Sequence, residues 1–229
     1  MKFHLSMAVF FSSVLSSTFS PHTFPAAMPS DLETAMELLI VVFHRYASQD
    51  GRAGTLSRRE LRQLMENELA NFLKSQKDPG AIDKIMKDLD ANGDGQVDFE
   101  EFVALVVGLS VACEQCYKMH QGLKSAKKSL GCLAAIMSDI QKAMALLITT
   151  FTKYASKEGD KHTLNKEELK ELLQNEFGDL LCKANDQTAV DRIFSDLDTN
   201  KSNSVDFSEF VNLVSCLTQM CHEHFIGKQ

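Results

Sequence analysis

The sequence predicts an all-α protein made of two four-helix modules. Apolar residues recur at helical intervals along most of the chain, with little sign of the alternation typical of strands. Residues 137–229 repeat residues 29–120 at a constant offset of 108 without insertion or deletion. Within the repeat, the polar stretch DANGDGQVDFEE at residues 90–101 recurs in altered form as DTNKSNSVDFSE at residues 198–209.

Composition limits the classes of partner. The chain has 229 residues, a formal net charge of −7 and no long run of lysine or arginine. Nucleic acid is therefore not expected as a partner, because phosphate binding depends on basic side chains. Cations and basic or apolar peptides fit this charge better. The six cysteines form no evenly spaced framework, which predicts free thiols and a cytoplasmic location, with an extracellular location as the alternative.

The repeat also defines the expected domains. Residues 29–120 and 137–229 form the two modules, and residues 121–136, rich in glycine, serine and lysine, form a linker. Residues 1–28 are predicted to be a leader, disordered or signal-like, and are too short and serine-rich to predict a membrane span. Met28 and Met137 each precede a capping serine and a helix. The sequence therefore fits either a true tandem chain or two separate proteins joined in one gene model.

Each module is expected to open with an amphipathic helix. Apolar residues recur at intervals of three and four from Leu32 to Phe43 and from Ile140 to Phe151. Capping boxes, which satisfy the unpaired amides at a helix start, are predicted for two pairs: Ser30 with Glu33, and Ser138 with Gln141. Further helices are predicted at residues 57–71, 81–89, 99–117, 165–177, 188–197 and 207–224.

Residues 90–101 have the donor pattern of a twelve-residue EF-hand loop, which surrounds a calcium ion with oxygen ligands. The expected ligands are Asp90, Asn92, Asp94, Gln96 through its carbonyl, Asp98 (often through water) and Glu101 as a bidentate carboxylate. Gly95 occupies the sixth position, where the chain turns sharply, and Val97 at the eighth is expected to pair with a neighbouring loop. The alternative is an acidic surface turn that binds no ion.

Residues 198–209 keep the same spacing with weaker donors. The expected ligands are Asp198, Asn200, Ser202, Ser204 through its carbonyl, Asp206 and Glu209. Ser202 replaces a carboxylate, and Asn203 replaces the glycine of the turn, although asparagine tolerates the left-handed conformation. We expect this loop to bind calcium more weakly than the first, or to have lost useful binding.

A second EF-hand is expected before each of these loops, because EF-hands pair. The stretches YASQDGRAGTLSRRE (residues 46–60) and YASKEGDKHTLNKEE (residues 154–168) lack an Asp-x-Asp-x-Asp pattern but end in a glutamate after a fourteen-residue interval. In this respect the chain resembles two tandem members of the S-100 family of calcium sensors. The first half is most similar to the alpha chain and the second to the beta chain. The resemblance implies that each module is a pair of EF-hands, one with a long loop.

In the S-100 family the long loop binds calcium mainly through main-chain carbonyls. The resemblance implies the carbonyls of Ala47, Asp50, Arg52 and Thr55 with the Glu60 carboxylate, and the carbonyls of Ala155, Glu158, Asp160 and Thr163 with the Glu168 carboxylate. Arg52 adds positive charge where the second module has Asp160, so the first long loop is expected to bind weakly. Capping-box partnerships of Glu60 with Ser57 and of Glu168 with Asn165 are an alternative role that is compatible with calcium binding.

A sensor of this kind exposes an apolar groove on binding calcium and recruits a target protein or peptide. The resemblance places in the groove Phe72, Leu73, Ile82, Ile85, Phe102 and Val106, and Leu180, Leu181, Val190, Ile193, Phe210 and Val214. Plain core packing is the alternative for each of them. The rival function is a calcium buffer, or a secreted zinc- or calcium-sequestering protein, without a target. Catalysis is not expected, because the sequence has no nucleophile–base pair, phosphate loop or catalytic zinc motif.

Pairing and zinc are two further expectations from the resemblance. S-100 modules dimerise through their first and last helices, so we expect the two modules to pair within the chain, or whole chains to dimerise. Zinc is bound in related proteins by histidines at the dimer seam. The candidates here are His44, His162, His222 and His224, which form no complete set in either module and fit solvated surface histidines as well.

Overall fold

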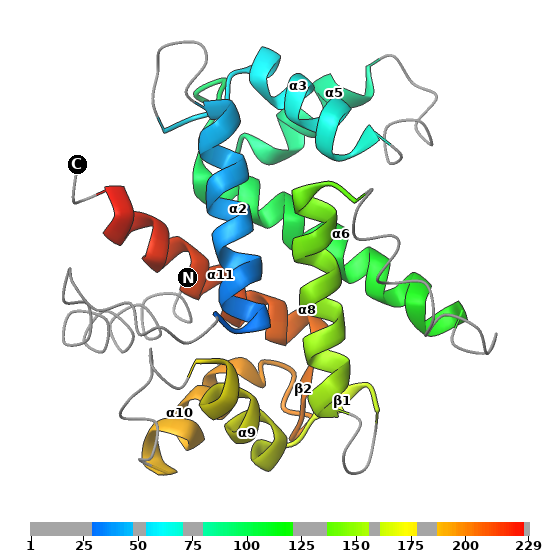
Figure 1. Ribbon diagram of the computed structural model, residues 1–229, viewed down its shortest axis with the longest axis vertical. Helices are drawn as coiled ribbons and strands as arrows, with labels where there is room; N and C mark the ends of the chain where they lie inside the picture. The colour runs from blue at the N-terminus through cyan, green and yellow to red at the C-terminus, as the bar shows by residue number, and fades with distance from the viewer. Residues whose placement is uncertain are drawn as a thin grey trace. The chain divides into compact units, whose positions relative to one another are not determined.

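The computed structural model describes residues 29–47, 54–70, 80–120, 137–155, 161–177 and 187–226 (Figure 1). The first module supplies helices α2 (Asp31–Ala47), α3 (Arg58–Glu68), α5 (Ala81–Leu89) and α6 (Phe99–His120). The second supplies α8 (Asp139–Ala155), α9 (Lys166–Glu176), α10 (Gln187–Leu197) and α11 (Phe207–Ile226). The predicted all-α class, with four helices in each module, is confirmed.

Two very short strands are an addition to this prediction. Strand β1 (Thr163–Leu164) pairs antiparallel with β2 (Val205–Asp206), with Leu164 opposite Val205. At the equivalent place in the first module, Leu56 and Val97 form an isolated antiparallel bridge. Two residues are too few to produce a visible alternation in the sequence, so these pairs were not predicted as strands, although the pairing of Val97 with a neighbouring loop was.

The predicted caps form at the helix starts. Ser30 accepts from the Glu33 amide at 3.1 Å, and the Glu33 carboxylate accepts from the Ser30 amide at 2.9 Å. Ser138 and Gln141 make the same reciprocal pair at 3.3 and 3.2 Å. Helices α3 and α9 open with capping boxes as well, built from Ser57 with Glu60 and from Asn165 with Glu168.

The chain folds into two compact units whose limits differ from those of the sequence modules. The N-module unit contains Glu37–Ala145, and the C-module unit contains the described residues up to Met36 together with those from Leu146 onward. The first turns of α2 therefore fold with the second module, and the first turns of α8 fold with the first module.

Each unit has an aromatic core that joins its first helix to its last. In the N-module unit the Phe43 ring lies 5.1 Å from Phe99 and 5.4 Å from Phe102, between ring centroids. In the C-module unit Phe151 lies 5.3 Å from both Phe207 and Phe210. These clusters hold the start of the last helix of each module, and therefore the loop that precedes it, against the first helix of that module.

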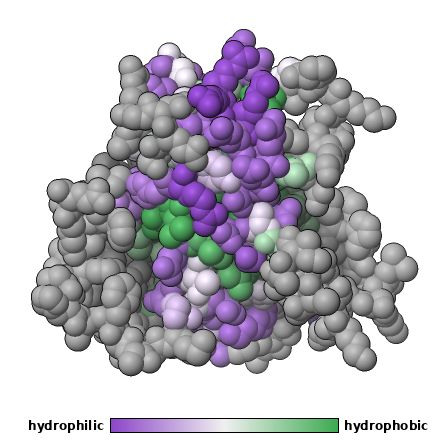
Figure 2. All heavy atoms as spheres, turned by 45° about the horizontal axis from the view of Figure 1, so that its top comes forward, coloured by the Kyte–Doolittle hydropathy of each residue, from purple (hydrophilic) through white to green (hydrophobic). Residues whose placement is uncertain are grey.

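In the view of Figure 2 the described residues are mainly hydrophilic, and hydrophobic residues show between them near the centre of the view. Among the described residues, the large apolar side chain that is exposed is Val41, at 45%. None of the helices in the described part of the chain is long and apolar enough to cross a membrane.

Candidate calcium-binding site

The loop between α5 and α6 is organised around Asp90. Its carboxylate accepts hydrogen bonds from the amides of Gly93 at 2.7 Å, Asp94 at 3.1 Å and Gly95 at 2.9 Å. Gly93 and Gly95 have φ angles of +75° and +78°, in the left-handed region that favours glycine. The turn predicted at Gly95 is thus present. It curls the loop, and the expected calcium ligands at the first, third and fifth positions all lie within this curled stretch.

Glu101 connects the two ends of this loop. Its Oε1 accepts from the Ala91 amide at 2.9 Å, and its Oε2 accepts from the Asp98 amide at 3.0 Å. Asp98 in turn accepts from the Glu101 amide at 2.9 Å. The side chain is almost buried although it sits in the first turn of α6. Both of its oxygens are therefore held toward the loop, as a bidentate calcium ligand requires.

The loop between α10 and α11 has the same frame. Asp198 accepts from the amides of Ser202 at 2.8 Å and Asn203 at 2.9 Å. Glu209 accepts from the Thr199 amide at 3.0 Å through Oε1 and from the Asp206 amide at 3.1 Å through Oε2. Glu209 and Glu101, which align in the sequence repeat, thus also occupy equivalent positions in the two folded loops.

Two features distinguish the second loop from the first. The Ser202 hydroxyl donates to the Ser204 carbonyl at 2.9 Å, and this carbonyl is the ligand expected at the seventh position. Lys201 and Asn203 have φ angles of 58° and 63° at positions where the first loop has glycines. Asn203 was recognised from the sequence, whereas Lys201 was missed. The available signal was its alignment with Gly93.

The left-handed conformation of Lys201 leads to a stability prediction. A side chain there costs about 1–2 kcal/mol, partly offset by the greater freedom of glycine in the unfolded chain. Lys201→Gly should therefore stabilise the C-module unit by up to about 1 kcal/mol in chemical denaturation. The matched control is Ser202→Gly, because Ser202 is not among the described residues with positive φ. That change should destabilise the unit, and stabilisation by both substitutions would contradict the explanation.

The long loops are described at their ends. Ala47 and Ala155 are the last residues of α2 and α8, and Thr55 and Thr163 lie beside the bridge and in β1. Asp50, Arg52, Glu158 and Asp160 lie outside the described residues. Glu60 and Glu168 are 2% and 4% exposed and serve as the capping-box partners of Ser57 and Asn165.

Main-chain pairing links the long loop to the twelve-residue loop in each module. The Leu56 amide donates to the Val97 carbonyl at 2.7 Å, and the Val97 amide donates to the Leu56 carbonyl at 2.9 Å. The Thr55 hydroxyl also donates to the side-chain oxygen of Gln96. The long loop and the twelve-residue loop of the first module are therefore hydrogen-bonded directly to each other.

The donor chemistry of the twelve-residue loops fits calcium. Their expected ligands are carboxylate, amide and carbonyl oxygens, the hard donors that calcium prefers. Across the described part of the chain, no three His, Cys, Asp or Glu side chains converge as a ready metal cluster. In the loops the carboxylates accept backbone amides instead. His44, His162 and His222 take part in no such cluster, and the side chain of His224 lies outside the described residues.

Most of the residues assigned to a target groove are buried in this structure. Ile85 is half-buried, and seven others are at most 8% exposed: Ile82, Phe102, Val106, Val190, Ile193, Phe210 and Val214. Phe72, Leu73, Leu180 and Leu181 lie outside the described residues. The described members therefore belong to the cores of their units in this conformation.

Comparison with known proteins agrees with this architecture. The model of the S-100/ICaBP type calcium binding domain matches residues 32–76 and 140–184, and EF-hand models match residues 81–109 and 190–214. Ictacalcin from Ictalurus punctatus is 54% identical over 92 residues, which are 40% of this chain and 100% of ictacalcin. Protein S100-A11 from Oryctolagus cuniculus is 51% identical over 39% of this chain and 87% of its own length. Protein S100-A10 from Gallus gallus is 49% identical over 44% of this chain and its whole length. The chain belongs to the S-100 family of non-enzymatic calcium-binding proteins and carries the family's domain twice.

Proposed function

We propose that the protein is a calcium sensor in which residues 90–101 form the tightest site, residues 198–209 a weaker one and the long loops the weakest. The observation that carries this proposal is the position of Glu101, which is hydrogen-bonded to both ends of its loop. A calcium ion that engages both Glu101 oxygens competes with these two bonds. Binding would therefore change the relation between the end of α5 and the start of α6.

Helix α5 is the element expected to move. It packs against α3 and α6 (Figure 1), and its apolar face buries Ile82 and Met86, each 8% exposed. Returning two such side chains to water costs about 3–6 kcal/mol. Binding stabilises the calcium-bound state by about 2.7 kcal/mol at a hundredfold excess of calcium over the dissociation constant and by about 4.1 kcal/mol at a thousandfold excess. This free energy is comparable with the cost of opening the helix and uncovering apolar surface.

Opening helix α10 would expose more buried apolar side chains than opening α5. The buried apolar side chains of α10 are Val190, Ile193, Phe194 and Leu197. Exposing four such groups costs about 6–12 kcal/mol, and its loop has the weaker donors. The first module is therefore the more responsive of the two. The net charge of −7 favours a target peptide with basic as well as apolar residues.

The alternative is a calcium buffer, whose helices barely open on binding the ion. A fluorescent dye that reports exposed apolar surface separates the two functions. We expect its emission to rise when calcium is added to the whole chain and to stay unchanged with magnesium. Glu101→Gln should remove most of the rise, whereas Glu100→Gln, on the exposed neighbour, should keep it. Calcium binding by calorimetry without any rise in emission would favour the buffer.

We further propose that the two modules pair within one chain and that the protein works inside the cell. The fold of each unit supports the pairing, because each contains the start of the other module's first helix. The six cysteines form no evenly spaced framework in the sequence, which supports a reducing compartment. A monomeric mass by light scattering supports pairing within the chain, and a stable dimer of whole chains argues against it.

A further inference from the structure

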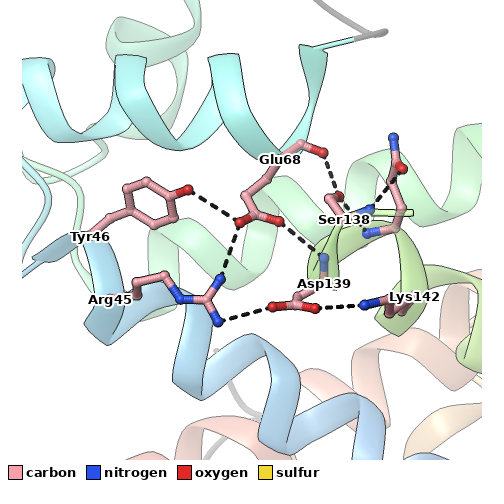
Figure 3. Close-up of polar contacts among 7 residues, drawn as sticks. Arg45, Tyr46, Glu68, Ser138, Asp139 and Lys142 are labelled. Atoms are coloured by element: carbon pink, nitrogen blue, oxygen red, sulfur yellow. Dashed lines mark hydrogen bonds and ion pairs between the residues drawn. The ribbon is translucent and has the colours of Figure 1, made fainter. Parts of the chain in front are cut away.

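A buried carboxylate at the end of α3 collects contacts from three segments of the N-module unit (Figure 3). Glu68 is 6% exposed, and its Oε1 accepts from the Tyr46 hydroxyl at 3.2 Å and from Arg45 at 3.4 Å. Its Oε2 accepts from the Asp139 amide at 3.1 Å. Its main-chain carbonyl accepts from the Ser138 hydroxyl at 2.6 Å. Glu68 therefore joins the end of α2, the end of α3 and the start of α8.

In the C-module unit the tyrosine, basic side-chain and serine contacts of this arrangement recur around Glu176. Glu176, at the end of α9, is 5% exposed and accepts from the Tyr154 hydroxyl at 2.8 Å and from Lys153 at 3.2 Å. Its main-chain carbonyl accepts from the Ser30 hydroxyl at 2.7 Å. Burial raises the pKa of both tyrosines, so both hydroxyls are protonated donors at neutral pH. Two occurrences at equivalent positions argue against an accidental contact.

The physical chemistry favours this arrangement on both sides. A buried carboxylate is costly unless it is hydrogen-bonded, and the last carbonyls of a helix lack partners within it. The start of α8 supplies hydrogen-bond donors both to the buried carboxylate and to the unpaired carbonyl. Its Asp139 amide, at the positive end of the helix dipole, meets the Glu68 carboxylate, and the Ser138 hydroxyl meets the carbonyl. Arg45 is half-exposed and also pairs with Asp139 at 3.0 Å, a contact that solvent weakens.

Glu68 also connects the two helices that flank the long loop. Tyr46 directly precedes Ala47, where α2 ends and the long loop begins. Glu60, which ends the loop, lies on the same helix as Glu68. The Tyr46–Glu68 bond thus ties the helix that precedes the long loop to the helix that follows it. In the C-module unit Tyr154 and Glu176 tie α8 to α9 in the same way.

We propose that Glu68 and Glu176 are positioning residues for the long calcium loops, and that each is completed by the first-helix start of the other module. Ser138, in the second module, then supports calcium binding in the first, and Ser30 supports it in the second. The inference rests on the proposed function of the long loops as calcium sites.

The test is a calcium titration of the whole chain that follows the backbone amides of Glu60 and Glu168 by NMR, one in each long loop. Ser138→Ala should weaken the affinity reported by Glu60 by about two- to tenfold, which is the effect of one buried hydrogen bond, and leave that reported by Glu168 unchanged. Ser30→Ala is the matched variant and should have the reverse effect. A purely structural role would shift both reporters together.

Two further variants separate the lost contact from a lost helix cap, because Ser138 also accepts from the Gln141 amide. Ser138→Thr keeps the hydroxyl and should restore the affinity reported by Glu60. Ser138→Asp still caps α8 but cannot donate to the Glu68 carbonyl, so the affinity should stay low. Tyr46→Phe should weaken the same loop from its other side.

The outcomes distinguish the two proposals. Equal changes at Glu60 and Glu168 in each serine variant, or no change at either, would overturn the positioning role while the long loops remain calcium sites. If neither amide responds to calcium in the unmodified chain, calcium binding by the long loops fails, and the positioning role fails with it. The shifts of Gly95 and Asn203 in the same spectra would then still report the twelve-residue loops.

Discussion

Glu101→Gln should abolish the tightest phase of calcium binding in a calorimetric titration. The substitution replaces a bidentate carboxylate with an amide that offers one oxygen and no charge. Ligand charge and number set the affinity of these loops over several orders of magnitude, so the expected loss is on the order of a hundredfold or more. The structure adds a reason, because each Glu101 oxygen is held by an amide from a different end of the loop.

The matched control is Glu100→Gln. Glu100 is the preceding residue in the first turn of the same helix, and its side chain is exposed. The Glu100→Gln substitution removes the same charge next to the loop without removing a ligand. It should change the calcium affinity by no more than about twofold, as expected for a screened surface charge. Glu209→Gln should remove a weaker phase. If Glu209→Gln removed the tightest phase instead, the proposed order of the sites would be wrong.

Much of the fold could be predicted because its determinants are local. The apolar period from Leu32 to Phe43 and the serine caps lie within a few residues of one another, and the helices formed close to the expected positions. Helix α3 ends at Glu68, three residues earlier than expected, and Leu69 caps it by donating to the Met65 carbonyl. Apolar residues continue beyond this point, so the hydrophobic pattern alone overestimated the length.

The parts that could not be predicted depend on contacts distant in sequence or on unusual backbone geometry. The Ser138–Glu68 contact joins residues 70 positions apart, and no local spacing in the sequence predicts it. The left-handed Lys201 was missed because lysine does not favour this conformation, and only the loop frame imposes it. For the calcium ligands, spacing was informative because the twelve-residue loop is itself a local structure.

The second large effect is expected on stability. Phe102→Ala should destabilise the N-module unit by about 3–5 kcal/mol in chemical denaturation. Phe102 is fully buried, and its ring packs beside Phe43 and Phe99, with centroid distances of 5.4 and 6.2 Å. Removing it leaves a cavity between the first and last helices of this unit. Val41→Ala is the control on the first helix, because Val41 is 45% exposed and should lose less than about 1 kcal/mol.

The location of the damage can be tested as well as its size. Hydrogen exchange should accelerate in α3, α5 and α6 of the Phe102→Ala protein, and Phe210→Ala should accelerate exchange in α9, α10 and α11 instead. Because Phe102 directly follows Glu101, calcium should restore part of the lost stability through its loop, by about 2.7 kcal/mol at a hundredfold excess over the dissociation constant. Calcium should give no such rescue when Glu101→Gln is combined with Phe102→Ala. A full rescue in that double variant would show that the calcium stabilising the N-module unit binds elsewhere than residues 90–101.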